Sequence, residues 1–511
     1  MTLPLSVFRH LFASVADEMG EALRLSSVSP NVKERLDFSC ALLDGKGRLV
    51  AHAAHIPVHL GSAHMTVPAV LAELDPGPGD IVVLNDPHRG GTHLNDVTVV
   101  APLFHRGRRL GFLLDRAHHA DVGGAEPGSM GGARDLSEEG ICMGPTWLAR
   151  RGRNVKSAWD GFLGAVRDPE AGRGDLLAQC AALHRGGERF ADLVHRFGAD
   201  EVERAMSGLV AHGEKLTAAL LRSWPVGEAE ARDRLDGPGS PEIRCRVKLG
   251  RGRLTVDFSG TSPQAPGSWN THRAVVTSAV FYVLQSLSPD EIPETSGTLA
   301  RVTLKLSPGS LVSSSAPAGV ALGNVETSQR IVDVLLQALG KLLPGVVPAS
   351  SQGTMNNLLF GGIRADGRPF VHYETLGGGA GGGPSGVGAS AVQVHMTNTR
   401  NTPVEVLEAE LPVRVTALGV RRGSGGRGRH RGGDGMVKEV EFLEPARVTV
   451  AASRRRQGPP GARGGRAGAP GLDTATLDGK STPLEPGKPV DFQPGDKVRL
   501  ATPGGGGWGR P

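Results

Sequence analysis

Apolar residues near the N-terminus recur every three or four positions. Phe8, Phe12, Val15, Met19 and Leu23 follow this spacing, and acidic side chains lie between them. The period is typical of an amphipathic helix and differs from the pattern of a signal or transit peptide. The sequence therefore predicts a helix that packs on a core, with no targeting peptide.

Short apolar runs separated by turn residues come next. They predict a hairpin over residues 38–52, strands over 81–84 and 97–103, and a return strand over 110–117. Polar residues gather where these strands end. Because loops at strand ends carry many binding and catalytic side chains, we expect the chemistry of the protein in this region.

The helical period returns between about residues 168 and 224 and predicts two or three helices there. Beyond it we expect a strand over 243–249 and a helix over 328–343. We divide the chain after the helical segment, into an N-terminal half (1–225) and a C-terminal mixed α/β half (239–511).

Glycine is the unusual feature of the composition. The 511 residues include 74 Gly and 36 Pro but only 14 Phe, 5 Trp and 2 Tyr. Such a chain is expected to have many turns and close-approach loops and few long helices. Together with the mixture of strands and helices, this predicts an α+β fold with a mixed, multi-layer architecture rich in glycine loops.

Glycine-rich stretches also occur in nucleotide-binding loops, but neither signature is complete here. Gly479-Lys480-Ser481 lacks the leading glycine of a P-loop, because position 474 is Thr474. The tract 377–383 does not follow a strand–helix–strand unit, as a dinucleotide fingerprint requires. We expect no Rossmann or P-loop domain, and close backbone packing explains the tract better.

Charge and cysteine usage narrow the class of protein. The net charge is +5, and the basic stretch GSGGRGRHRGGDG resembles RNA-binding sequence. It has no interleaved aromatic residues on which bases could stack, so we expect no nucleic-acid partner. The four cysteines form no CxxC pair, which fits a reducing cytoplasm. No run of about 18 apolar residues occurs, so no membrane span is predicted.

The densest group of chemically active residues lies in LNDPHRGGTHLNDV and LDRAHHADVGG. His93 and Asp96 precede a strand and His118 ends its predicted neighbour, so the three side chains can converge. Two imidazoles and one carboxylate suit Mn²⁺, Fe²⁺ or Zn²⁺ and leave positions open for water or substrate. Taken singly, each of these residues could instead have a structural role, in which its side chain forms hydrogen bonds that hold the loop in place.

A second polar group lies upstream, in SPNVKERLDFSCALLD and AHIPVHLGS. Glu34 and Asp37 are candidate carboxylate ligands there. His59 is the residue that we expect in the wall of a polar cleft, and we assign it, with Asp86, to substrate binding. The simpler alternative is that these side chains satisfy backbone groups.

At these clusters the sequence resembles the hydantoinase B/5-oxoprolinase B-type family, which includes the B-type chain of N-methylhydantoinase and is related to the acetone carboxylase α subunit. The resemblance covers nearly the whole chain. Further markers are VDFSGTSPQ, GNVETSQR, YETLGGGAGG, NTRNTPVEVLE and TPGGGGWG.

The resemblance implies a subunit of an ATP-dependent enzyme that opens a small cyclic amide of the hydantoin, N-methylhydantoin or 5-oxoproline type. ATP is bound by an A-type partner in a hetero-oligomer, which accounts for the missing P-loop. The N-terminal half would then carry the metal, and the C-terminal half would close the cleft and contact the partner. The alternatives are a subunit of a ketone carboxylase and a non-catalytic scaffold.

The resemblance also implies roles for single residues. The metal is expected to be manganese, with zinc and iron as alternatives, and Glu34 is the expected fourth ligand beside His93, Asp96 and His118. His119 and Asp121 are the candidates for proton transfer. Orienting the metal-bound imidazoles is the other role open to these two residues.

Overall fold

The computed structural model describes residues 3–53, 56–289 and 292–511. In these residues the strands form four sheets, mostly antiparallel, with helices packed between and around them. The predicted α+β, multi-layer architecture is confirmed. Within the same residues, no helix combines the length and the apolar character that crossing a bilayer requires.

The first sheet has the strand order β2-β1-β5-β4-β3-β6-β7. Its strands are β1 Phe38–Asp44, β2 Leu49–Ala53, β3 Ile81–Leu84, β4 Asp96–His105, β5 Arg108–His118, β6 Thr146–Arg150 and β7 Arg153–Asn154. The helices of this half are α1 Leu5–Ser26, α2 Pro30–Lys33, α3 Pro57–Leu60, α4 Ala63–Leu71, α5 Leu136–Glu139, α6 Lys156–Leu163, α7 Pro169–Phe197 and α8 Ala199–Ser223, with a 3-10 turn, η1 Pro127–Ser129.

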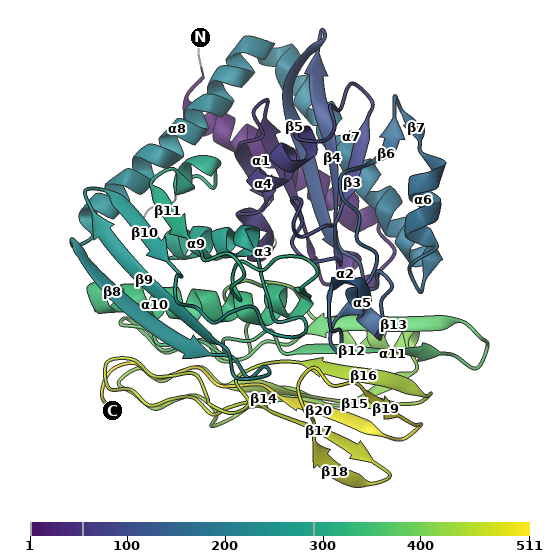
Figure 1. Ribbon diagram of the computed structural model, residues 1–511, viewed down its shortest axis with the longest axis vertical. Helices are drawn as coiled ribbons and strands as arrows, with labels where there is room; N and C mark the ends of the chain where they lie inside the picture. Colours follow the sequence, from purple (N-terminus) through teal and green to yellow (C-terminus); the bar gives the residue numbers. More distant parts are fainter. Residues whose placement is uncertain (1–2, 54–55, 290–291) are drawn as a thin grey trace.

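Both faces of this sheet are covered, so every residue of β1 is buried. Cys40 and Leu42 pack in one hydrophobic cluster with α1 and α7, whereas Ala41 and Leu43 pack with α4 on the other face. Alternate residues of a strand point to opposite faces, which explains why β1 is a continuous apolar run. The sheet and these helices are the upper right part of Figure 1.

The expectation of few long helices is wrong for this half. Helices α1, α7 and α8 have 22, 29 and 25 residues, and α7 and α8 occupy the predicted helical segment. Glycine does not break α7 because it lies where α7 packs closely on another helix. A Cβ on Gly186 would lie 2.5 Å from the sulfur of Met19 in α1. The glycine therefore allows the two helices to approach closely.

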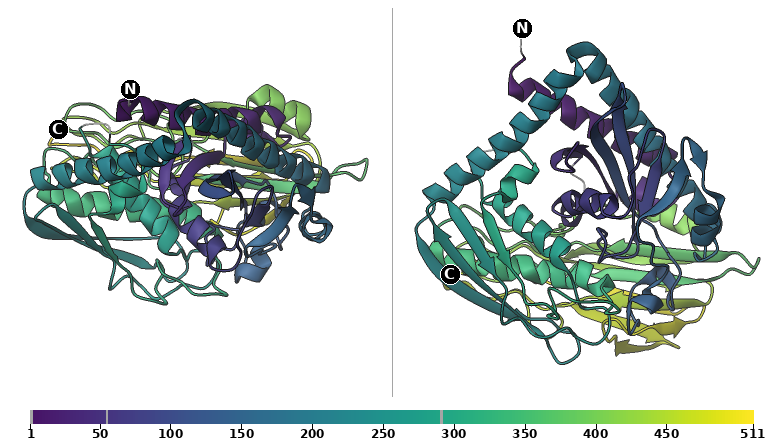
Figure 2. Two further views of the ribbon diagram at one scale, coloured as in Figure 1. Left: turned by 90° about the horizontal axis from the view of Figure 1, so that it is seen from above. Right: turned by 45° about the horizontal axis from the view of Figure 1, so that its top comes forward.

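Helix α8 runs from the apex of the molecule to the second sheet, as both Figure 1 and the right view of Figure 2 show. This sheet has the order β11-β10-β9-β8. Its elements are β8 Gly227–Arg234, β9 Glu242–Gly250, β10 Arg253–Asp257 and β11 Val302–Lys305, with α9 Arg273–Ser286, η2 Ser296–Leu299, the π-helical turn η3 Gly323–Thr327 and α10 Ser328–Leu342.

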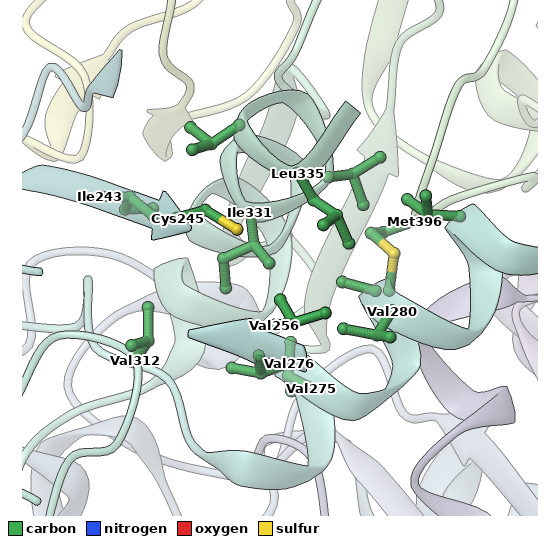
Figure 3. Close-up of a cluster of buried hydrophobic side chains, with 14 of the residues drawn as sticks. Ile243, Cys245, Val256, Val275, Val276, Val280, Val312, Ile331, Leu335 and Met396 are labelled. Atoms are coloured by element: carbon green, nitrogen blue, oxygen red, sulfur yellow. The ribbon is translucent and has the colours of Figure 1, made fainter. Parts of the chain in front are cut away.

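Strand β9 alternates buried and exposed residues, which gives the sheet one apolar face. Ile243 and Cys245 from this face meet Val280 of α9 and Ile331 of α10 in the cluster drawn in Figure 3. Helix α9 was not predicted. It is apolar around most of its circumference, so it has almost no amphipathic period to detect.

Two further sheets pack on each other in the C-terminal part, the lowest layer of Figure 1. One has the order β13-β12-β16-β19 and the other β14-β15-β20-β17-β18. The elements are β12 Asn357–Ile363, β13 Pro369–Thr375, α11 Val404–Glu410, β14 Val413–Arg421, β15 Gly435–Phe442, β16 Ala446–Ala451, β17 Leu472–Leu477, β18 Lys480–Pro483, β19 Val490–Phe492 and β20 Lys497–Ala501.

The glycine-rich stretches between these strands hydrogen-bond to one another. Gly382 N–H donates to the carbonyl of Gly506, Gly505 N–H to that of Gly433, and Gly433 N–H to that of Ala380, at 2.8–2.9 Å. A Cβ on Gly433 would lie 1.8 Å from the carbonyl oxygen of Ala389, so only glycine fits. Close backbone packing is therefore confirmed as the role of the 377–383 tract.

Candidate metal centre

The site forms where β4 begins and β5 ends. Asp96 and His118 are direct partners in the antiparallel register of these strands. His93 lies one turn before Asp96, whose N–H donates to the His93 carbonyl at 3.0 Å. Strand pairing and a tight turn therefore bring together the three residues predicted from the sequence.

The three side chains are close enough to bind one ion. His93 Nε2 lies 3.2 Å and His118 Nδ1 3.4 Å from Asp96 Oδ1, and the three candidate ligand atoms all lie within 4.8 Å of one another. All three residues are at most 3% exposed. Metal–ligand bonds of 2.0–2.2 Å produce ligand–ligand separations of this size.

Several polar atoms of this group lack a hydrogen-bond partner within the described part of the chain. They are both ring nitrogens of His93, Nε2 of His118 and Oδ1 of Asp96. A buried polar atom left unpaired costs about 1–3 kcal/mol, so this group calls for a compensating interaction. A divalent cation would supply it for Asp96 Oδ1 and for one nitrogen of each ring, and the residues present fit such an ion.

The electrostatics favour the forms of these side chains that bind metal. Burial by itself would raise the pKa of Asp96, but His93, His59 and His118 hold it well below its ordinary value. Burial lowers the pKa of His118. Ionised carboxylate and neutral imidazole are the states that bind a divalent ion.

His59 also belongs to the centre. Its Nε2 lies 3.3 Å from Asp96 Oδ2, and its Nδ1 lies 3.0 Å from the hydroxyl of Ser39. The residue assigned to substrate binding thus holds the second oxygen of Asp96. Direct contact with substrate stays a prediction for His59.

A buried arginine ties together the segments that carry these residues. Arg116 donates to Thr98 at 2.8 Å, to Thr66 and the carbonyl of Gly90 at 3.0 Å, and to Ser62. Burial lowers its pKa to about 10. Arg116 was not among the residues predicted from the sequence, although its position two residues before His118 puts it on the same face of β5.

His119 points to the other face of the strand. Its Nε2 lies 3.0 Å from Oε1 of Gln179 in α7, and Gln179 donates to Asp115 at 2.7 Å. Asp121 accepts from the N–H groups of Gly123 and Gly128 and from Arg167. His119 and Asp121 line a cavity of about 280 Å³ between α2, α7 and β13.

Two predicted residues do not belong to the group of candidate ligands found among the described residues. Glu34 is half-buried at the end of α2, where its charge acts on Arg24. Asp86 accepts from the N–H of His88 at 2.8 Å and holds the turn before His93. Their assignments, as fourth ligand and as substrate contact, stay predictions.

The fold and the site define an α+β protein with a buried His–Asp–His group between two strands that could hold a metal ion. The sequence profile of the Hydantoinase B/oxoprolinase family matches residues 1–511, so the chain belongs to that family.

Two relatives by sequence represent two kinds of enzyme. The chain is 37% identical to 5-oxoprolinase 1 of Arabidopsis thaliana over 99% of its length, and it spans 41% of that protein. It is 29% identical to the B-type chain of a putative D-/L-hydantoinase of Pseudomonas sp., over 98% of this chain and 88% of that one. The chain thus spans about two fifths of the 5-oxoprolinase and most of the hydantoinase chain.

Two solved structures share the fold. An ATP-dependent caprolactamase from Pseudomonas jessenii aligns with a TM-score of 0.91 at 25% identity, over 100% of this chain and 93% of that one. A nucleotide-free acetone carboxylase aligns with a TM-score of 0.90 at 18% identity, over 99% of this chain and 75% of that one. The second likeness shows the fold alone.

Proposed function

We propose that this chain is the B-type subunit of an ATP-dependent cyclic amide hydrolase. The observation that supports this most is the buried His93–Asp96–His118 group in a chain related to a 5-oxoprolinase and similar in structure to a caprolactamase. The ring opened would be of the hydantoin, N-methylhydantoin or 5-oxoproline type. The complex would be cytoplasmic, with ATP bound by an A-type subunit.

His93, Asp96 and His118 would hold the divalent ion, manganese first and zinc or iron as alternatives. Such an ion polarises a carbonyl or lowers the pKa of bound water. Ring opening adds water across the amide C–N bond, with oxygen going to carbon and a proton to nitrogen. The chain's task would be to hold the reacting groups in a buried site.

His119 and Asp121 are our candidates for moving that proton, or for orienting the centre from outside it. Their contacts with Gln179 and Arg167 support the orienting role. Replacing His119 by Gln distinguishes the two roles. Normal metal content with turnover reduced by about 10²-fold or more would indicate proton transfer, whereas loss of metal would indicate orientation.

We also propose that residues 1–225 carry the metal and that residues 239–511 close the cleft and contact the A-type subunit. Cross-linking of the assembled, full-length complex tests this assignment. It should yield contacts to the A-type subunit from the C-terminal half. Contacts confined to residues 1–225 would contradict the assignment.

The function is tested with the chain and its A-type partner purified together. Hydantoin, N-methylhydantoin, 5-oxoproline and caprolactam are offered with ATP, and we expect the opening of at least one ring to consume ATP. The His93→Ala variant should lose this activity, while the control His88→Ala, in the same loop and exposed, should keep most of it.

Two results would favour the alternatives. Consumption of ATP with acetone and bicarbonate, but with none of the four rings, would indicate a ketone carboxylase, the alternative enzyme that the sequence resemblance leaves open. Full ring-opening activity in the His93→Ala variant would indicate a scaffold.

A further inference from the structure

A tyrosine from the C-terminal half lies against a ligand of the candidate metal centre. The rings of Tyr373, in β13, and His118 are stacked, with centroids 4.5 Å apart and planes 14° apart. The contact continues to His93, whose ring centroid lies 5.0 Å from that of His118. The residues are buried, so the three rings form one packed series at the centre.

This contact matters for His118 because the second nitrogen of its ring has no hydrogen-bond partner among the described residues. A ligating histidine usually donates its second ring nitrogen to a carboxylate or carbonyl, which sets the ring plane. Over the residues that the structure describes, His118 Nε2 has no such partner, and Nδ1 faces Asp96, itself a candidate ligand. The face of Tyr373 is therefore the surface that limits rotation of His118.

The tyrosine is itself held at both ends. Its hydroxyl donates to Asn357 Oδ1 at 3.0 Å, and Asn357 donates to Glu326 in the π-helical turn at 3.0 Å. Arg35 donates to the Tyr373 carbonyl at 2.9 Å, and its guanidinium carbon lies 4.7 Å from the ring centre. A ring fixed in this way is a rigid support.

We propose that Tyr373 is a positioning residue of the metal centre: it holds the His118 imidazole in the orientation that binds the ion. The C-terminal half would then complete a site whose ligands all come from the N-terminal half. This inference rests on the proposed metal centre and adds a residue that acts through one of its ligands.

Cobalt is the probe for the test, because its visible absorption reports ligand geometry and its binding can be titrated on the full chain. Replacing Tyr373 by Leu should weaken Co²⁺ binding by about 10- to 100-fold, as expected for loss of an outer contact to a ligand, and should change the absorption band. Tyr373→Phe keeps the ring and should bind Co²⁺ like the parent protein with an unchanged band.

The other tyrosine of the chain provides a matched control. Tyr282 lies edge-to-face on His395, 5.9 Å between centroids, and His395 is not one of the candidate ligands. Tyr282→Leu should therefore lose packing without loss of Co²⁺ affinity. If Tyr373→Leu does not fold, Tyr373→Met replaces it, because an unbranched side chain fills more of the space.

The outcomes separate the two proposals. A parent protein that binds no Co²⁺ would contradict the metal centre and this inference together. A parent that binds Co²⁺ tightly, with Tyr373→Leu or Tyr373→Met folded and equal to it in affinity and spectrum, would overturn the inference alone. Equal weakening in Tyr282→Leu would also overturn it, since general loss of packing would then explain the effect.

Discussion

Asp96 connects more of the site than any other side chain. Its Oδ1 faces His93 and His118, and its Oδ2 faces His59. The sequence allowed three ligands to be predicted because strand ends and a short loop bring them together. It could not reveal the contact of His59 with Asp96 or that of Tyr373 with His118, because both depend on long-range packing. The one sequence feature that pointed to Tyr373 was its place in the family marker YETLGGGAGG.

Replacing Asp96 by Asn tests this arrangement at the residue scale. The amide has the same shape but no charge, so we expect a folded protein with greatly reduced affinity for a divalent ion. Ligand binding at 100 times the dissociation constant stabilises a protein by about 2.7 kcal/mol. Added Mn²⁺ should therefore raise the thermal midpoint of the parent protein but not of Asp96→Asn, as measured by scanning calorimetry.

At the scale of elements, the strands around the site were predictable because each is an apolar run between turn residues. Helix α9 was missed because it is apolar on most sides. The helical segments of α1, α7 and α8 were predicted, but their length was not, because glycines within them serve close packing. The segment 457–470 is rich in Gly, Pro and Arg and has no apolar period, so its sequence predicts no regular element. It is ordered within this chain, since Gly468 N–H donates to the Pro459 carbonyl and Arg466 N–H to that of Arg427.

The glycine-rich segments make an element-scale prediction. Gly433→Ala places a Cβ 1.8 Å from a backbone oxygen, and relieving that clash requires segments to move apart. We expect a loss of stability of at least about 2 kcal/mol, at the upper end of overpacking effects. Gly386→Ala is the control, because its Cβ would meet no atom within 4 Å. Equal unfolding midpoints in urea would contradict the close-packing role.

At the scale of the whole molecule, buried ion pairs join parts that are distant in sequence. Asp333 of α10 lies 3.2 Å from His395 and 2.8 Å from Arg454, and Arg454 also contacts Asp233 of β8 at 2.7 Å. Burial by itself would raise the pKa of Asp333, but these partners lower it to about 2. The sequence gives no sign of this network, because its members are scattered over more than two hundred positions.

This network predicts a dependence of stability on acid. A carboxyl with a pKa of 3.8 in the unfolded chain and about 2 in the folded one stabilises the protein above pH 4. That stability, roughly 2–3 kcal/mol, is lost as the pH falls from 4 through 2. Asp333→Asn should be less stable at pH 7 and should show a flatter decline below pH 4 in urea titrations. The exposed Asp366→Asn should keep the parent's profile.

The metal content of the purified protein tests the His93–Asp96–His118 site most directly, measured by elemental analysis beside His93→Ala, His118→Ala and the control His88→Ala. We expect nearly one equivalent of a divalent transition metal in the parent and in His88→Ala, and little in the other two. A parent protein without metal, even after incubation with manganese, zinc and iron, would contradict the metal site and leave the buried histidines as a polar core.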